Sequence, residues 1–423
     1  MADAIDREWK AREERPLEMT QATSAQLMDR TEIDADAIIY PPELLGELIR
    51  RQWIEELPPS LLENEALAVE DVFPALRQTE LQWGGETYAV PFGSSTFVLM
   101  YRPEVFAELE LTPPQTWREY QVCVDRIAAS QFCAGDEAPF AAPTLEPLAE
   151  PWRSKWFLAR AASYAKNPSN YAVLFGLASG DALIGQQSFV KAAEDLRRAA
   201  DAIPTKLQSL SPAEAGVQFL AGKAPMAIGW LPHPAEENTA KVDFSPSFAP
   251  LPGAIEYWNQ LTEAWERRRN DRPAVVPLLT VSGRIGSVAT GSKNTRDAAL
   301  GLILLSASDS APQVSPASEA TSVYRNTNLF GVAQWVDSRL SSEASSAYAE
   351  ALATELSSSE AFGLNLPGAS RYWGVLEKAI GEILVEGSDP KAILEKAAQA
   401  WDEVTDDLGR PAQVKAYSAS LGV

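Results

Sequence analysis

Histidine is almost absent from this sequence: its 423 residues include one, His233, set between two prolines. Catalytic triads, histidine-rich zinc sites and most general-base arrangements need that side chain. No Gly-x-Ser-x-Gly elbow, P-loop or Gly-x-Gly-x-x-Gly motif occurs, and a match of Ser188 and Lys191 to Ser-x-x-Lys lacks its companion motifs. The sequence therefore predicts no catalytic residue and no metal site, although its many acidic residues leave a catalytic carboxylate pair open.

Cysteine is also scarce, with Cys123 and Cys133 as the two examples. Residues 117–129 have a helical pattern, and ten helical residues span roughly 15 Å. A disulfide needs Cα atoms within about 7 Å of each other. We therefore expect two free thiols, and two cysteines are too few for a cysteine-based metal cluster.

Long apolar runs and positive charge are lacking as well. No stretch approaches the ~20 apolar residues of a membrane span, and the first residues do not have the pattern of a signal peptide. The net charge is −22 and the isoelectric point is about 4.6. Because a negative surface repels phosphate groups, nucleic acid and anionic lipid are not expected as partners.

Helical and strand patterns alternate through the first hundred residues. We expect helices at residues 5–12, 24–30 and 43–53, and extended segments or strands at residues 16–22, 35–40, 87–90 and 96–101. This alternation predicts an α/β fold with a mainly parallel sheet and helices on both of its faces.

After residue 102 the pattern becomes mainly helical, and a strand returns at residues 284–290. We expect helices at residues 117–129, 188–203, 212–221, 294–306 and 390–408, and an exposed loop at 306–322. The ends of these helices have specific signals. Thr116 and Glu119 fit a capping box, Asp389 before Pro390 is a natural N-cap, and Gly409 follows the last helical residue.

Aromatic side chains are abundant, with twelve tryptophans and eleven tyrosines. An indole offers a flat apolar face and one N–H donor, which suits the C–H face and polar edge of a sugar ring. Most tryptophans, however, fill protein cores. The composition therefore permits an aromatic sugar site built from a few of these residues.

Several motifs occur together in one order along the chain. The last but one has the pattern Phe-x-x-Gly-Lys-Ala-x-Met, and together the set resembles the solute-binding proteins of ABC importers, family 1, in the branch that includes maltose-binding proteins. The segments that carry the resemblance are Asp36–Tyr40, Trp53–Pro58, Tyr88–Gly93, Leu99–Phe106, Pro114–Glu119, Phe219–Trp230 and Ala249–Gly253.

This resemblance implies a two-lobe fold of the periplasmic binding protein type (type II), with the ligand in a cleft between the lobes. Lobe one would comprise residues 1–102 plus 280–325, and lobe two residues 106–275 plus 330–423. Closure would be a hinge motion about the segments that cross between the lobes.

The resemblance also implies a set of ligand contacts. Tyr40, Trp230 and Trp373 fall at positions of stacking aromatics. Trp152 lies in a Glu-Pro-aromatic segment, and Glu43 lies near a hydroxyl-binding acid. The implied ligand-binding residues are Tyr40, Glu43, Ser94, Ser95, Glu150, Trp152, Trp230, Arg325 and Trp373.

The function implied is the capture of a small polar ligand, with a sugar as the expected class, for delivery to an ABC permease. No cofactor is implied, and the protein would act as a monomer in the periplasm or elsewhere outside the cytoplasm. Family members begin with an export signal and a strand ahead of the first helix, so we expect an upstream segment that supplies both. The alternatives are a sensor or scaffold with the same fold, and a carbohydrate-active enzyme.

Overall fold

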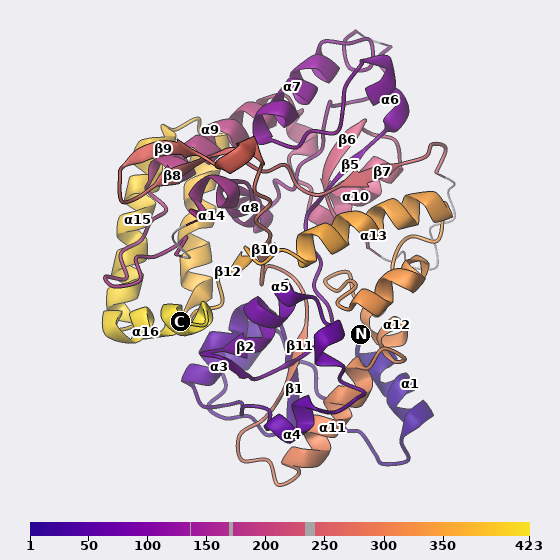
Figure 1. Ribbon diagram of the computed structural model, residues 1–423, viewed down its shortest axis with the longest axis vertical. Coiled ribbons are helices and arrows are strands. Elements are labelled where there is room, and N and C mark those ends of the chain that lie inside the picture. Colours follow the sequence, from indigo (N-terminus) through magenta and orange to yellow (C-terminus); the bar gives the residue numbers. More distant parts are fainter. Residues whose placement is uncertain (136, 169–171, 233–241) are drawn as a thin grey trace.

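The computed structural model describes residues 1–135, 137–168, 172–232 and 242–423, and His233 lies outside these ranges. The chain forms two lobes, one above the other in Figure 1, and each contains a three-stranded sheet. The N-terminal elements build the lower lobe, and the C-terminal helices stand beside the upper lobe. We call the lower one the first lobe and the upper one the second lobe.

The sheet of the first lobe joins distant parts of the chain. Its order is β1 (Ala37–Tyr40), β11 (Ile285–Val288), β4 (Val90–Pro91), and both pairs of neighbours are antiparallel. The expectation of a mainly parallel sheet is therefore wrong here. Alternating helices and strands suggest parallel crossovers, but the partner of β1 and β4 enters from a segment about 200 residues or more further along the chain and runs the opposite way.

Helices cover both faces of this sheet, as expected. One face packs under α1 (Ala2–Arg12) and α11 (Thr295–Ser306), where Trp9 and Leu302 meet Val90 and Val288. The opposite face holds Tyr40 and Ile285 against α3 (Leu45–Arg50). Strand alternation sends successive side chains of β1 to these two cores.

Two segments of the first lobe differ from expectation. Residues 16–22 form no strand, and they continue as coil to α2 (Ser24–Met28). The expected exposed loop at 306–322 is about half buried and contains α12 (Ala311–Val314). The small side chains explain the burial, since Ser315 donates a hydrogen bond to the Phe92 carbonyl (2.7 Å) inside the lobe.

The second lobe has the sheet order β6 (Met226–Gly229), β5 (Val98–Tyr101), β7 (Ser247–Ala249), again antiparallel. Because β5 already belongs to this sheet, the chain crosses between the lobes at residues 92–97. The expected boundary at residue 102 stays a prediction. One face of the sheet, with Val98 and Met100, packs under α10 (Pro212–Leu220) and α13 (Ser342–Leu356). The other face, with Leu99 and Ile228, belongs to the core that contains α7 (Trp117–Ala128) and α8 (Trp152–Ala165).

A helical layer completes the second lobe. It contains α7 (Trp117–Ala128), α8 (Trp152–Ala165), α9 (Gln187–Asp201), α14 (Ala369–Val385) and α15 (Pro390–Asp407). The predicted capping box at the start of α7 and the Asp389 cap of α15 are both confirmed. Cys123 and Cys133 are free, as expected.

Shorter elements connect these layers. The helices are α4 (Pro59–Leu62), α5 (Pro74–Leu76), α6 (Pro103–Glu108) and α16 (Arg410–Ser420). The strands are β2 (Gln82–Trp83), β3 (Glu86–Thr87), β8 (Glu256–Asn259), β9 (Ala264–Arg267), β10 (Leu278–Leu279) and β12 (Phe362–Gly363). The 3₁₀-helices are η1 (Pro42–Leu44), η2 (Val69–Asp71), η4 (Thr205–Leu207), η5 (Arg269–Asp271), η6 (Ser315–Ala317) and η7 (Asn326–Gln334), and η3 (Arg77–Leu81) is a π-helix.

The segments between the lobes meet at one buried carboxyl group. Glu80 accepts hydrogen bonds from Ser94 Oγ (2.5 Å) in the first crossing and from the Thr280 amide (2.9 Å) in the second. Thr280 Oγ1 in turn accepts from the Leu364 amide (3.0 Å), just after β12, which pairs with β10. Burial raises the pKa of Glu80 to about 7. We call Glu80, Ser94, Thr280 and Leu364 the crossing node.

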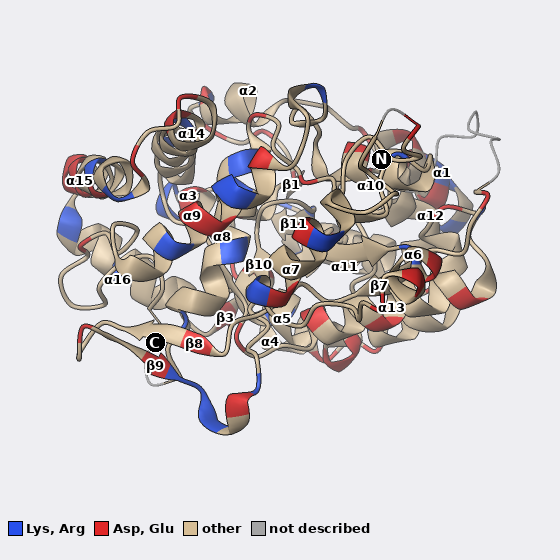
Figure 2. Cartoon of the chain, turned by 90° about the horizontal axis from the view of Figure 1, so that it is seen from above, with Lys and Arg blue, Asp and Glu red and all other residues tan. Residues whose placement is uncertain are grey.

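Acidic residues are frequent on α13 and α15, which Figure 2 shows as red segments of the chain. None of the described helices is long and apolar enough to cross a membrane.

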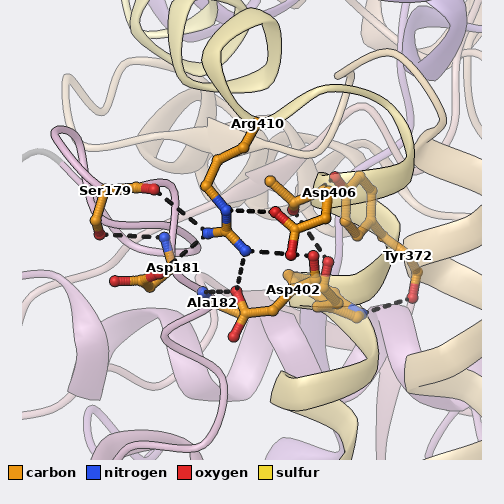
Figure 3. Close-up of polar contacts among 9 residues, drawn as sticks. Ser179, Asp181, Ala182, Tyr372, Asp402, Asp406 and Arg410 are labelled. Carbon is orange, nitrogen blue, oxygen red and sulfur yellow. Dashed lines mark hydrogen bonds and ion pairs between the residues drawn. The ribbon is translucent and has the colours of Figure 1, made fainter.

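An arginine fastens the C-terminal corner of the second lobe (Figure 3). Arg410, at the start of α16, lies 2.6 Å from Asp406, 3.0 Å from Asp181 and 3.7 Å from Asp402. Asp402 also accepts a hydrogen bond from the Ala182 amide (2.9 Å). These bonds tie the loop before α9 to the corner between α15 and α16, and so help to fix the layer that contains α14.

Candidate functional site

A cavity of about 650 Å³ opens where the two lobes face each other. The first lobe contributes Glu43, from η1. The second lobe contributes the start of α8, with residues 150, 151 and 153–155, and one face of α14, between Ser370 and Glu386. A cavity of this size is typical of sites for small molecules.

Lys155 projects from α8 into this cavity and reaches toward the first lobe. Its ammonium donates a hydrogen bond to the Val281 carbonyl (3.2 Å) and lies 3.9 Å from the Glu43 carboxylate. It also lies 4.8 Å from the ring centroid of Trp152 and 5.8 Å from that of Trp373. Burial lowers the pKa of Lys155, while the charges of Glu43 and Glu377 oppose that shift.

A second ion pair fixes the start of α8 against α14. Arg153 Nε lies 2.5 Å from one carboxylate oxygen of Glu377, and the other oxygen accepts from the Ser154 amide (3.0 Å). Gly381 makes room for this arrangement, because a Cβ there would come within 3.1 Å of the Arg153 guanidinium. The pair therefore holds the wall of the cavity in one position.

Three indoles lie in or beside the cavity. Trp373 lines it, and Trp152 packs edge-on against Trp230 with ring centroids 5.2 Å apart. Among the described residues, the buried Nε1 groups of Trp230 and Trp373 have no hydrogen-bond acceptor. A buried donor without a partner is unfavourable, so an acceptor that reached either N–H would be stabilised there.

The structure brings part of the predicted site together. Glu43, Glu150 and Trp373 line the cavity. Trp152 lies beside the lining residue Lys155, and Trp230 packs behind it against Trp152. Glu150 is at the rim, with 74% of its side chain exposed, 3.5 Å from Arg153.

Three other predicted residues do not line the cavity. Tyr40 is 1% exposed, and its hydroxyl pairs with Ser287 Oγ (2.7 Å). Ser94 donates to Glu80 in the crossing node, and Ser95 Oγ donates to the Glu319 carbonyl (3.4 Å). These polar groups are used inside the fold, so we leave these residues out of the proposed site.

Arg325 also lies away from the cavity, fully buried in the first lobe. Its guanidinium donates to the carbonyls of Leu67 (2.6 Å) and Ser306 (3.0 Å). It thereby joins the chain before η2 to the end of α11. This geometry favours a structural role, because an arginine whose donors bind backbone carbonyls has few left for a ligand.

Sequence reasoning missed Lys155, Arg153 and Glu377. A signal for Lys155 was present: it follows Trp152 by three residues on a helix, which places both on one face. Glu377 and Arg153 come from segments more than 200 residues apart, and no local pattern links them. Within the described ranges, no group of His, Cys, Asp or Glu is arranged to hold a metal ion.

Two lobes joined by crossing segments, with a polar and aromatic cavity between them, define a ligand-binding protein of the two-lobe type. Residues 18–299 match the family of bacterial extracellular solute-binding proteins, and the chain belongs to that family. This confirms the resemblance noted in the sequence.

Solved structures of the same class share the fold. An ABC transporter solute-binding protein from Agrobacterium radiobacter K84, in complex with ribitol, is 13% identical with a TM-score of 0.65, over 88% of this chain and 85% of that one. MalX from Streptococcus pneumoniae, in complex with maltopentaose, is 13% identical with a TM-score of 0.61, over 95% and 96%. The sugar-binding protein MalE from Xanthomonas citri is 16% identical with a TM-score of 0.63, over 88% and 84%. No curated protein matches the chain.

Proposed function

We propose that this protein binds a sugar or polyol in the cavity between its lobes and delivers it to the permease of an ABC importer. The observation that carries the proposal is the indole of Trp373, which lines the cavity and whose buried N–H has no acceptor in the part of the chain that the structure describes. Carboxylate, ammonium and guanidinium groups at the same cavity can bond to hydroxyl groups. Structurally similar proteins hold ribitol, mannitol and maltose.

The binding residues we propose are Glu43, Glu150, Trp152, Trp230 and Trp373, together with Lys155. We propose residues 1–97 plus 280–325 as lobe one, and 98–275 plus 330–423 as lobe two. The crossings near residues 92–97 and 280–284 would then act as the hinge. The protein would work as a monomer outside the cytoplasm, with no chemistry performed on the ligand.

A thermal-shift screen with ribitol, mannitol, maltose and maltopentaose tests this function. A ligand that binds only the native state at 100 times its Kd adds about 2.7 kcal/mol to the free energy of unfolding. We expect at least one such compound to raise Tm at a concentration where sucrose does not. Chromatography of the incubated sugar tests for turnover, and we expect it unchanged.

A matched variant can show that the stabilisation comes from the cavity. Gly374 lines the cavity, and a Cβ at this position would meet no atom within 4 Å. Gly374→Phe should therefore fill the cavity without disturbing α14, and it should abolish the sugar-dependent shift while leaving Tm without sugar nearly unchanged. An equal shift in this variant would place binding elsewhere.

A further inference from the structure

The ammonium of Lys155 occupies a position suited to any organic cation. Two indole rings lie 4.8 and 5.8 Å away, a carboxylate lies 3.9 Å away, and a backbone carbonyl accepts a hydrogen bond at 3.2 Å. Cations are attracted to the faces of aromatic rings, most strongly to indole. We call this arrangement of Trp152, Trp373, Glu43 and the Val281 carbonyl the cation seat.

The cation in the seat is held there by the fold. Lys155 is one helical turn after Trp152, so the ring and the ammonium share one face of α8. The ion pair between Arg153 and Glu377 fixes the start of α8 between these residues. With 13% of its side chain exposed, Lys155 has little freedom to leave the cavity for solvent.

The carboxylates around the seat are already matched by cationic side chains of the protein, so they do not favour a second cation. Glu43 faces both Lys155 and Arg284, since its charge affects the pKa of each side chain. Glu377 is paired with Arg153. Glu43 and Glu377 therefore each already have a cationic neighbour from the chain. An anionic ligand would come close to these two carboxylates and be repelled by them.

We propose that Lys155 is a specificity-determining residue: it fills the cation seat with the chain's own ammonium and restricts the cavity to uncharged, hydroxyl-rich ligands. This proposal rests on the proposed function. The ammonium offers hydrogen bonds to the hydroxyl oxygens of such a ligand, and it repels a charged amine that would otherwise occupy the seat.

The seat can be tested without any sugar. Lys155→Ala removes three carbons and the ammonium, which correspond to n-propylammonium. We expect n-propylammonium to raise the Tm of this variant and to bind it at least tenfold more tightly than the neutral control 1-propanol, with Kd measured by NMR titration. The wild-type protein, whose seat is filled, should show no such difference. Equal binding of the two probes to the variant would overturn the cation seat.

Glu43→Gln in the Lys155→Ala background is the control for the carboxylate. We expect it to weaken n-propylammonium binding several-fold and to leave 1-propanol unaffected. If the preference for the ammonium persists unchanged, Glu43 is not part of the seat and the proposal fails in that respect.

Selectivity is tested with Lys155→Met, which retains the aliphatic stem and therefore the packing. For a neutral sugar found to bind the wild type, its amino-sugar counterpart should bind the wild type at least tenfold more weakly. We expect that ratio to fall at least tenfold in Lys155→Met. An unchanged ratio would overturn the proposal while the proposed function stands. If no sugar or polyol binds the wild type, the proposed function fails, and the n-propylammonium titration still decides whether the seat exists.

Discussion

At the scale of single residues, Trp373 offers the most direct test of ligand binding. Trp373→Ala removes a cavity wall and an N–H donor, so we expect the affinity for the sugar that gives the largest thermal shift to fall at least tenfold. Trp373→Phe keeps an aromatic face and loses the donor, so its affinity should lie between those of the wild type and Trp373→Ala. Isothermal titration calorimetry measures all three.

Trp265→Ala is the matched control for this series. Trp265 lies in β9, is 39% exposed and packs edge-on against Trp258, outside the cavity. It should lose an indole without losing affinity. If Trp265→Ala and Trp373→Ala weaken binding equally, the loss reflects general destabilisation rather than a missing contact.

Glu80 predicts a pH dependence of stability. Its pKa is raised from 4.5 to about 7 by burial, so the folded state holds a proton that the unfolded state releases near pH 4.5. This stabilisation is fully present below pH 4.5 and is lost as pH rises through about 7. From the difference between the two pKa values, the free energy of unfolding falls by roughly 3 kcal/mol over this pH range. Glu80→Gln should remove this pH dependence, because the amide does not titrate and keeps a neutral carbonyl acceptor for Thr280.

Urea unfolding of the two proteins at pH 5 and pH 8 measures this effect. Relative to the wild type, Glu80→Gln should gain stability between these pH values. Glu86→Gln changes an exposed carboxylate in β3 and should track the wild type at both. A constant difference between wild type and Glu80→Gln across the range would show that Glu80 does not titrate there.

At the scale of secondary-structure elements, the sequence predicted what depends on near neighbours. Thr116 and Glu119 form their capping box three residues apart, and Asp389 caps α15 through the Ala392 amide. Whether neighbouring strands run parallel or antiparallel could not be predicted from near neighbours in the sequence. β1 pairs with β11 across a separation of 247 residues, and hydrophobic alternation is the same for parallel and antiparallel neighbours.

The residues of the candidate site differ in the same way: some could be proposed from local sequence, and others depend on distant segments. Trp373 and Glu43 were proposed from the resemblance to the family, and both line the cavity. Tyr40 and Arg325 were proposed in the same way, but their side chains turn into cores that distant segments complete, with Ser287 for Tyr40 and Leu67 for Arg325. Which way a side chain at the end of a strand points depends on the packing of the whole lobe.

Arg410 tests how strongly the C-terminal corner holds the helical layer. Arg410→Met removes the shared partner of Asp181, Asp402 and Asp406, which leaves three carboxylates close together. We expect a loss of about 1–2 kcal/mol in the free energy of unfolding, since the arginine is partly buried and serves several bonds. Chemical denaturation at low salt measures this loss.

The control is Arg371→Met, because Arg371 forms a single exposed pair with Asp407 at 2.7 Å. Exposed pairs contribute about 0–1 kcal/mol, so this variant should stay close to the wild type. If Arg371→Met lost as much free energy of unfolding as Arg410→Met, the effect would be common to cationic side chains at this corner and not specific to Arg410.

At the scale of the whole molecule, the two lobes should close around the ligand. The cavity is lined mainly by the second lobe, Glu43 of the first lobe faces it, and Lys155 links the two lobes through Val281 and Glu43. A ligand that contacts both sides stabilises the closed arrangement. Small-angle scattering should therefore give a smaller radius of gyration with a saturating sugar than without it.

Gly374→Phe provides the comparison for closure. With the cavity filled, the same sugar should leave the radius of gyration unchanged. A wild-type radius that does not respond to a bound sugar would show that the lobes are already fixed in one arrangement, and that binding involves no hinge motion.

The central position of β11 in the first sheet has a consequence for protein synthesis. β1 and β4 do not pair with each other, and each depends on β11, which begins at residue 285. A ribosome therefore completes β5 to β7 of the second sheet before it makes the strand that closes the first. During this interval the two outer strands expose unpaired backbone, which is a known route to aggregation. A nascent chain shorter than about 285 residues is thus expected to need a chaperone for its N-terminal part, even where its second sheet is already formed.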